Sequence, residues 1–146
     1  MLPLIALLAA QAANTPPTAV LSLPKQVASH ATFDAKLALT FAPGLHGYQN
    51  PPSDQFEIPV TVKLVKGDAR LVSVKYPKGT DMTMAGDSKP TRVYTGTVPI
   101  LVHLTAGTKG GELVLQVDYQ QCNEASCYPP AQVRAKANLA VGKKKG

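Results

Sequence analysis

Hydrophobic and polar residues alternate along most of this chain, a pattern typical of β-strands that bury one face. The alternation is clearest in three runs, which we predict to be strands: Thr32 to Phe41, Glu112 to Tyr119 and Val133 to Val141. Shorter runs predict further strands at Ala19 to Leu23, Ile58 to Leu64, Leu71 to Tyr76 and Val93 to Leu104. No stretch keeps a helical period, and Pro or Gly turns separate the runs. The pattern predicts an all-β protein, a single-domain immunoglobulin-like antiparallel β-sandwich of seven or eight strands, with one face of each strand buried.

Two segments lack this alternation and are predicted to be loops. One runs from Leu45 to Asp54 and is rich in His, Tyr, Asn and Pro. The other runs from Thr80 to Pro90 and contains Met82 and Met84.

The two ends of the chain differ from the alternating part. Leu2 to Ala10 is apolar and uncharged but much shorter than the ~20 residues that span a bilayer, and small residues at Ala10 and Ala12 suit cleavage after Ala12. We expect residues 1–12 to be a signal peptide, 13–18 a linker, 19–141 the folded domain and 142–146 a basic tail. The mature protein is expected to be exported, monomeric and not membrane-spanning.

Composition narrows the possible functions. The net charge is +6, but three consecutive lysines near the C-terminus supply half of it, and only 5% of the residues are aromatic, with no Trp. A protein with scattered basic residues and few stacking groups is not expected to bind nucleic acid. No carboxylate pair, Ser–His arrangement or Gly-rich phosphate loop is present, which disfavours hydrolysis and phosphoryl transfer; Asp118 and Glu124 are interpreted as solvated charges.

The only two cysteines, Cys122 and Cys127, flank a short polar segment, Asn123 to Ser126, that suits a hairpin turn. Opposed residues in an antiparallel pair have Cα atoms roughly 4.5–5.5 Å apart, a separation that a disulfide accepts. A ring this short stabilises the fold by only ~2 kcal/mol, and a domain of this size has little need of a staple. The residues alone leave three interpretations open: a structural clip, a redox-active pair and a pair of metal ligands.

The residues around the cysteines resemble a known family. Tyr119-Gln120 stands before Cys122, and Tyr128-Pro129-Pro130 follows Cys127. Other pieces of the same resemblance lie upstream: Gly44 to Tyr48, Asn50 to Asp54, Tyr76-Pro77, Thr80 to Lys89, and Val93-Tyr94 with Gly96. Together these segments, over residues 30–141, resemble the N-terminal periplasmic domain of the thiol:disulfide interchange protein DsbD.

The resemblance implies an immunoglobulin-like, periplasmic oxidoreductase domain without a cofactor. It would pass reducing equivalents to or from thioredoxin-fold proteins, with both the electron donor and the acceptor supplied in trans. In that family the second cysteine forms the mixed disulfide, so Cys127 would react with the partner and Cys122 would resolve the intermediate. Because a β-hairpin offers no helix dipole to lower a thiol pKa, the pair would depend on the partner's thiolate and on gating.

The same resemblance implies roles for residues around the pair. The segment from Asp81 to Gly86 would form a cap over the cysteines, with Met82 and Met84 where the family usually has aromatic residues. His46 and Tyr48 would lie beside the sulfurs, and Tyr128 would contact the partner.

Two alternatives remain. In one, the protein carries Cu(I), because thiolates and thioethers favour that ion; its ligands would be Cys122, Cys127, Met82, Met84 and His46. In the other, the protein is an interaction module whose disulfide is purely structural. In the exchange interpretation, no metal is expected.

Overall fold

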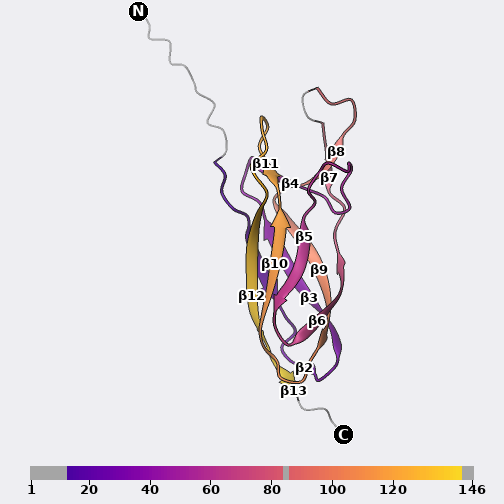
Figure 1. The fold of residues 1–146 in the computed structure, drawn as a ribbon, viewed down its shortest axis with the longest axis vertical. Helices are drawn as coiled ribbons and strands as arrows, with labels where there is room; N and C mark the ends of the chain where they lie inside the picture. The colour runs from indigo at the N-terminus through magenta and orange to yellow at the C-terminus, as the bar shows by residue number, and fades with distance from the viewer. Residues whose placement is uncertain (1–12, 84–85, 143–146) are drawn as a thin grey trace, which may run out of the picture.

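The computed structural model describes residues 13–83 and 86–142, and these residues form strands, turns and loops without a helix (Figure 1). The strands are β1 (Thr18–Ser22), β2 (Val27–Ala28), β3 (Thr32–Thr40), β4 (His46–Tyr48), β5 (Thr61–Lys66), β6 (Ala69–Lys75), β7 (Thr80–Met82), β8 (Thr91–Tyr94), β9 (Thr97–Ala106), β10 (Gly111–Tyr119), β11 (Gln121–Cys122), β12 (Ala131–Leu139) and β13 (Val141–Gly142). The described residues contain no helix that is long and apolar enough to cross a membrane. The expected signal peptide and the three C-terminal lysines lie outside the described residues.

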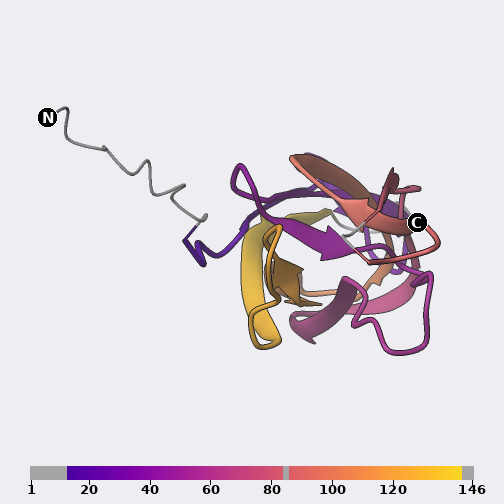
Figure 2. The same cartoon turned by 90° about the horizontal axis from the view of Figure 1, so that it is seen from above.

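Two antiparallel sheets form the body of the molecule. One has the strand order β1-β3-β9-β6 and the other β12-β10-β5. Seen from above, they lie as two layers around a common interior (Figure 2). The pairing of β3 with β9 is continuous from Thr32 opposite Thr105 to Thr40 opposite Thr97. The predicted immunoglobulin-like antiparallel sandwich is confirmed.

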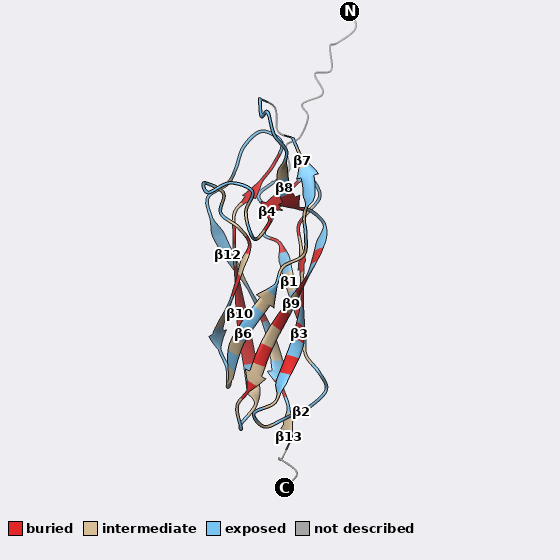
Figure 3. Cartoon of the chain, turned by 90° about the vertical axis from the view of Figure 1, so that its right-hand side faces the viewer, coloured by how far each residue is buried: buried red, intermediate tan, exposed pale blue. Residues whose placement is uncertain are grey.

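Apolar side chains from both sheets fill the space between the layers. Leu37, Ile100 and Leu104 come from the first sheet, and Leu115 and Val117 from the second. In β3, buried and more exposed residues alternate, as the sequence pattern predicts (Figure 3). Burial of these side chains, each contributing about 1.5–3 kcal/mol before the entropy of ordering is counted, gives the body its stability.

The predicted strand from Val93 to Leu104 is two strands. β8 ends at Tyr94 and β9 begins at Thr97, and the chain passes from one sheet to another between them. Gly96 makes this possible because its φ of 59° is accessible mainly to glycine; its carbonyl accepts a hydrogen bond from the Phe41 amide at 2.9 Å. Both predicted loops also contain short strands, β4 and β7, which pair with β8. Strands of three residues are too short to show a periodicity.

Strand β10 is buried on both faces, although its alternation predicts one buried face. Val114 and Gln116, on the expected solvent side, are only 3% and 8% exposed. The strand lies between β12 and β5, and long neighbouring side chains cover it: the Arg134 guanidinium donates to Gln116 Oε1 from Nε at 3.3 Å and Nη2 at 3.2 Å.

A third, smaller sheet of order β11-β4-β8-β7 lies at one end of the sandwich, and the short parallel pair of β13 and β2 lies at the other (Figure 1). Both cysteines are at the end with the smaller sheet, so this end carries the candidate site.

Candidate functional site: a disulfide at the end of the sandwich

Cys122 and Cys127 are bonded to each other across a tight turn. They face each other as an antiparallel pair, with Cα atoms 3.9 Å apart. The Asn123 amide donates to the Ser126 carbonyl at 2.9 Å, and the Tyr128 amide donates to the Gln121 carbonyl at 3.0 Å. The predicted hairpin turn and the predicted opposition of the two cysteines are confirmed.

The two cysteines differ in exposure. Cys122 is 0% exposed because it lies in β11, where it pairs with His46 of β4. Cys127, on the returning arm of the turn, is exposed. A thiolate from another protein can therefore approach the residue Cys127 from solvent, whereas Cys122 is covered by its own domain.

Asn123 holds the turn, a role that the sequence analysis missed. It is buried, and its Oδ1 accepts hydrogen bonds from the amides of Ala125 and Ser126, both at 2.8 Å. Its Nδ2 donates to the Tyr128 hydroxyl at 3.2 Å. Asn directly after a strand commonly bonds the backbone two residues on, so the signal was present in the sequence.

The neighbouring Gln121 anchors β11 to the segment that precedes β1. Its Nε2 donates to Asn14 Oδ1 at 2.7 Å and to the Thr15 carbonyl at 2.9 Å. The segment that precedes β1 therefore lies against β11, the strand that carries Cys122. Nothing in the local sequence indicates this contact, because it joins residues more than 100 positions apart.

The side chain of Tyr48 lies against the disulfide. Its hydroxyl oxygen lies 3.5 Å from the Sγ atoms of both Cys122 and Cys127. Since disulfide sulfurs carry no hydrogen, the hydroxyl is the donor. Burial raises the pKa of Tyr48, and the negative charges of Glu57 and Asp87 raise it further, so the hydroxyl keeps its proton at neutral pH.

His46 lies two residues before Tyr48 on β4, and the intervening Gly47 allows the strand to pass close to the core. A Cβ atom at Gly47 would meet the Phe41 ring at 2.5 Å. The His46 side chain is only 4% exposed, and burial lowers the pKa of its imidazole. Its ring makes an edge contact with that of Tyr48, with centroids 6.4 Å apart. His46 is thus a neutral group in contact with the tyrosine that touches both sulfurs.

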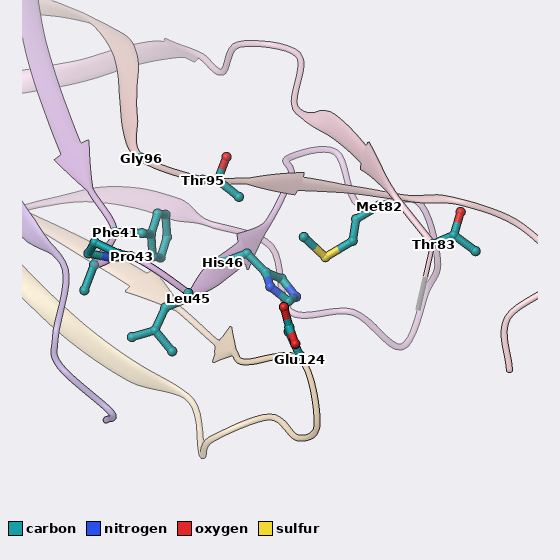
Figure 4. Close-up of a pocket in the computed structure, with 11 residues that line it drawn as sticks. Phe41, Pro43, Leu45, His46, Met82, Thr83, Thr95, Gly96 and Glu124 are labelled. Carbon is teal, nitrogen blue, oxygen red and sulfur yellow. The ribbon is translucent and has the colours of Figure 1, made fainter. Parts of the chain in front are cut away.

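A cavity of about 570 Å³ opens beside the cysteine turn. Phe41, Leu45 and Met82 supply apolar surface, and Figure 4 shows the His46 imidazole directed into it, with Glu124 of the turn on the same side. Neither cysteine is among the described residues that line the cavity.

The expected cap is only partly within the described residues. Asp81 and Met82 lie on β7, which pairs with β8, and Asp81 forms an exposed ion pair with Arg92 at 3.6 Å. Met82 lines the cavity together with His46. Met84 lies outside the described residues. The covering of the cysteines by this segment stays a prediction.

Tyr128 directly follows Cys127 and is integrated into the turn. Besides the hydrogen bond from Asn123 to its hydroxyl, its carbonyl accepts from Gln120 Nε2 at 3.1 Å. Its proposed contact with a partner is not tested by these bonds.

A second cavity, of about 530 Å³, is lined by both His46 and Tyr48. Its described lining includes Asp54, Glu57 and Asp87, and also Phe56, whose side chain is 83% exposed. Phe56 cannot be predicted as a site residue from the sequence, because a single aromatic residue in an irregular loop gives no pattern. A large apolar side chain this exposed, lining the same cavity as Tyr48, is a candidate contact residue.

These features allow thiol–disulfide chemistry at one accessible residue. No cluster of three or more His, Cys, Asp or Glu that could hold a metal ion is found in residues 13–83 and 86–142. Four of the five proposed copper ligands are described: the two cysteines are bonded to each other, and His46 and Met82 line a cavity that neither cysteine lines. Copper binding stays an alternative.

An immunoglobulin-like sandwich with a disulfide at its end defines a class of small β-domains, and comparison with known proteins defines the family. The family described as "Thiol:disulfide interchange protein DsbD, N-terminal" matches residues 16–138. Because this match covers most of the sequence, the chain belongs to that family. A search of curated proteins found no match.

Two solved structures that contain DsbD N-terminal domains are similar to this chain. The reduced N-terminal domain of DsbD from Neisseria meningitidis matches with a TM-score of 0.50 and 21% identity, covering 75% of this chain and 80% of that one. A complex between the DsbD N-terminal and PilB N-terminal domains from the same organism matches with a TM-score of 0.48 and 21% identity, covering 80% and 79%. At this level of identity, the first match supports the fold alone.

Proposed function

We propose that this domain exchanges thiols and disulfides with thioredoxin-fold proteins of the periplasm, carrying two electrons at a time on Cys122 and Cys127. The observation that carries the proposal is the unequal exposure of the bonded pair: Cys127 is exposed and Cys122 is buried. Membership of a family named for thiol:disulfide interchange supports the same conclusion.

Reduction of the domain follows from this geometry. A partner thiolate attacks the Cys127 sulfur, a partner–Cys127 disulfide forms, and the Cys122–Cys127 bond breaks with Cys122 leaving as a thiolate. A second partner thiolate then attacks the partner sulfur of the mixed disulfide and releases the Cys127 thiolate. The partner leaves as a disulfide, and the domain takes up two electrons and, at neutral pH, two protons.

The reverse sequence delivers the electrons. The Cys127 thiolate attacks a partner disulfide, and Cys122 then attacks the Cys127 sulfur and releases the reduced partner. In both directions a negative charge passes through the buried Cys122 sulfur. The Tyr48 hydroxyl, 3.5 Å from that sulfur, can donate a hydrogen bond to the thiolate and lower the cost of its charge. Tyr48 is thus proposed to stabilise the leaving group.

Trapping of mixed disulfides tests the proposal. Cys122→Ser leaves the exposed Cys127 without its resolving thiol, and we expect it to accumulate a disulfide-linked complex with a thioredoxin-fold protein in a periplasmic extract, identified by mass spectrometry. Cys127→Ser leaves only the buried Cys122 and is the matched control, expected to trap much less. Equal trapping by the two variants would contradict the roles proposed here. A reduction potential below about −300 mV, typical of structural disulfides, would contradict the function itself.

The location is part of the same proposal. We propose export to the periplasm with cleavage after Ala12, where a disulfide can persist. The N-terminal sequence of the protein recovered from a periplasmic fraction would begin at Ala13. Recovery of protein that still carries Met1 to Ala12 would contradict the cleavage.

A further inference from the structure

The cavity beside the cysteine turn combines apolar walls with side chains that can accept hydrogen bonds. Phe41, Leu45 and Met82 supply the walls. His46 is more than nine-tenths buried, and its ring faces the cavity (Figure 4); its nitrogens make no hydrogen bond to any described residue. Glu124 is exposed and forms no ion pair with a described residue. Both polar groups are therefore available to a ligand that donates hydrogen bonds.

The charges around the site favour a cation. The described residues that line the two cavities that share His46 carry four carboxylates, Glu124, Asp54, Glu57 and Asp87, and one lysine, Lys89. The chain as a whole carries +6. The cysteine end is thus locally acidic on a basic protein. Such a difference attracts a basic surface to this end and repels it from the rest.

We propose that the cavity formed by Met82, His46 and Glu124 receives a basic side chain, lysine or arginine, from the protein whose thiol attacks Cys127. The inference rests on the exchange function proposed above and names the partner surface that this site selects. Long basic side chains pack their methylene groups on apolar surface and keep the charged head at a polar group. Here the apolar walls take the methylenes, and the Glu124 carboxylate and a neutral imidazole nitrogen of His46 accept from the head.

Glu124 and Cys127 are close enough in the chain for one segment of the partner to reach both. Glu124 and Cys127 are three residues apart, which limits their Cα separation to about 10–11 Å. A basic residue a few positions from the attacking cysteine can therefore reach the cavity while the thiolate meets Cys127.

Peptides of matched shape test this directly. The probes are the acetylated, amidated peptides Cys-Gly-Lys, Cys-Gly-norleucine and Cys-Gly-Glu, with a second set that has one more Gly between Cys and the variable residue. Each is added in excess to the oxidised domain at low salt, and reduction of the Cys122–Cys127 disulfide is followed by alkylation and mass spectrometry. Two peptide molecules reduce one disulfide and form one peptide disulfide. Rates are compared per thiolate concentration, because the side-chain charge also shifts the peptide's thiol pKa.

We expect the lysine peptide of at least one set to react about threefold to fivefold faster than its norleucine analogue, because its positive charge is attracted to the carboxylate at a partly exposed site. The glutamate peptide should react more slowly than both, because its charge is repelled. Raising the salt concentration should shrink this spread. Glu124→Gln should remove most of the lysine advantage. Glu112→Gln makes the same change at the end of β10 that is farther from the cysteines, and it should leave the lysine advantage intact.

Three outcomes would overturn the inference. These are equal rates for the three side chains in both sets, an equal loss in Glu112→Gln and Glu124→Gln, or a larger loss in Glu57→Gln, which changes the other cavity. In each of these cases the disulfide is still reduced, so the exchange function stands. Failure of all peptides, and of a small neutral thiol, to reduce the folded domain would instead overturn the exchange function.

Discussion

The body of the sandwich and its cysteine end are held together by different interactions. In the body, strands of nine or ten residues such as β3 and β9 bury alternate apolar side chains. At the cysteine end the strands have two to four residues, and buried polar side chains tie them to loops. Gln49 is an example: its Oε1 accepts from the Gly79 amide at 2.7 Å and its Nε2 donates to the Pro51 carbonyl at 2.9 Å.

Two further polar contacts complete this framework. Asn50 Nδ2 donates to the Val60 carbonyl at 2.9 Å, and the Tyr94 hydroxyl donates to the Pro77 carbonyl at 2.7 Å. Such bonds fix geometry while contributing modestly to net stability. Stability and site geometry are thus divided between the two regions: the body supplies most of the stability, and the cysteine end holds the site. A cysteine can be exposed to solvent at one end while the apolar core of the body remains closed.

The largest expected effect is on the body. Leu104 is fully buried in β9, so Leu104→Ala should lower the free energy of unfolding by about 2–5 kcal/mol. The exchange rate of the protein that remains folded should be nearly unchanged. Chemical denaturation and disulfide reduction assays measure the two quantities. Val20→Thr, at an exposed apolar position, is the control and should stay within about 0.5 kcal/mol of the parent. A large loss of exchange in folded Leu104→Ala would show that the two regions are not separate.

Removal of the disulfide should destabilise the protein less than Leu104→Ala does, but it should abolish thiol–disulfide exchange. A six-residue ring accounts for about 2 kcal/mol in the chain-entropy model, so Cys122→Ala/Cys127→Ala should lower the free energy of unfolding by about that amount. Reduction of the parent protein should give a similar loss and serves as the control for the substitutions. A loss well above that caused by Leu104→Ala would indicate a structural staple.

The smallest expected effect is a pH dependence at the cysteine end. Burial lowers the pKa of the folded-state His46 below its usual value of 6.5, so in the window between these two pKa values the unfolded chain binds more protons than the folded one. Stability is therefore complete above pH 6.5 and falls as the pH decreases through that window. His46→Gln should lose less stability than the parent between pH 7.5 and 5.5 in urea titrations. His30→Asn, at an exposed position with positive φ that Asn tolerates, should behave like the parent. An unchanged pH dependence in His46→Gln would contradict the prediction.

The sequence predicts the body well because burial there produces periodicity. The alternation in Thr32 to Phe41 gives β3 almost to the residue. It fails where other forces decide: the division at Gly96 depends on a change of sheet, and the second buried face of β10 depends on side chains from neighbouring strands. Neither leaves a signal within the segment itself.

The site is predictable in part. The spacing of Cys122 and Cys127 predicts their bond, and the family resemblance places His46 and Tyr48 near them. The unequal burial of the two cysteines depends on the pairing of β11 with β4, a contact between residues far apart in the chain. Glu124 is exposed, as expected of a solvated charge, but only the folded structure places it on the same cavity wall as His46.

The hydrogen bonds from Gln121 to Asn14 and Thr15 also fix where the chain enters the fold. The described chain begins beside the disulfide and ends at β13, at the opposite pole (Figure 1). A label, bead or fused protein joined upstream of Asn14 is therefore held at the cysteine end, beside β11, where it would obstruct docking or raise the local concentration of whatever it carries. One joined beyond Gly142 projects away and leaves the redox surface open.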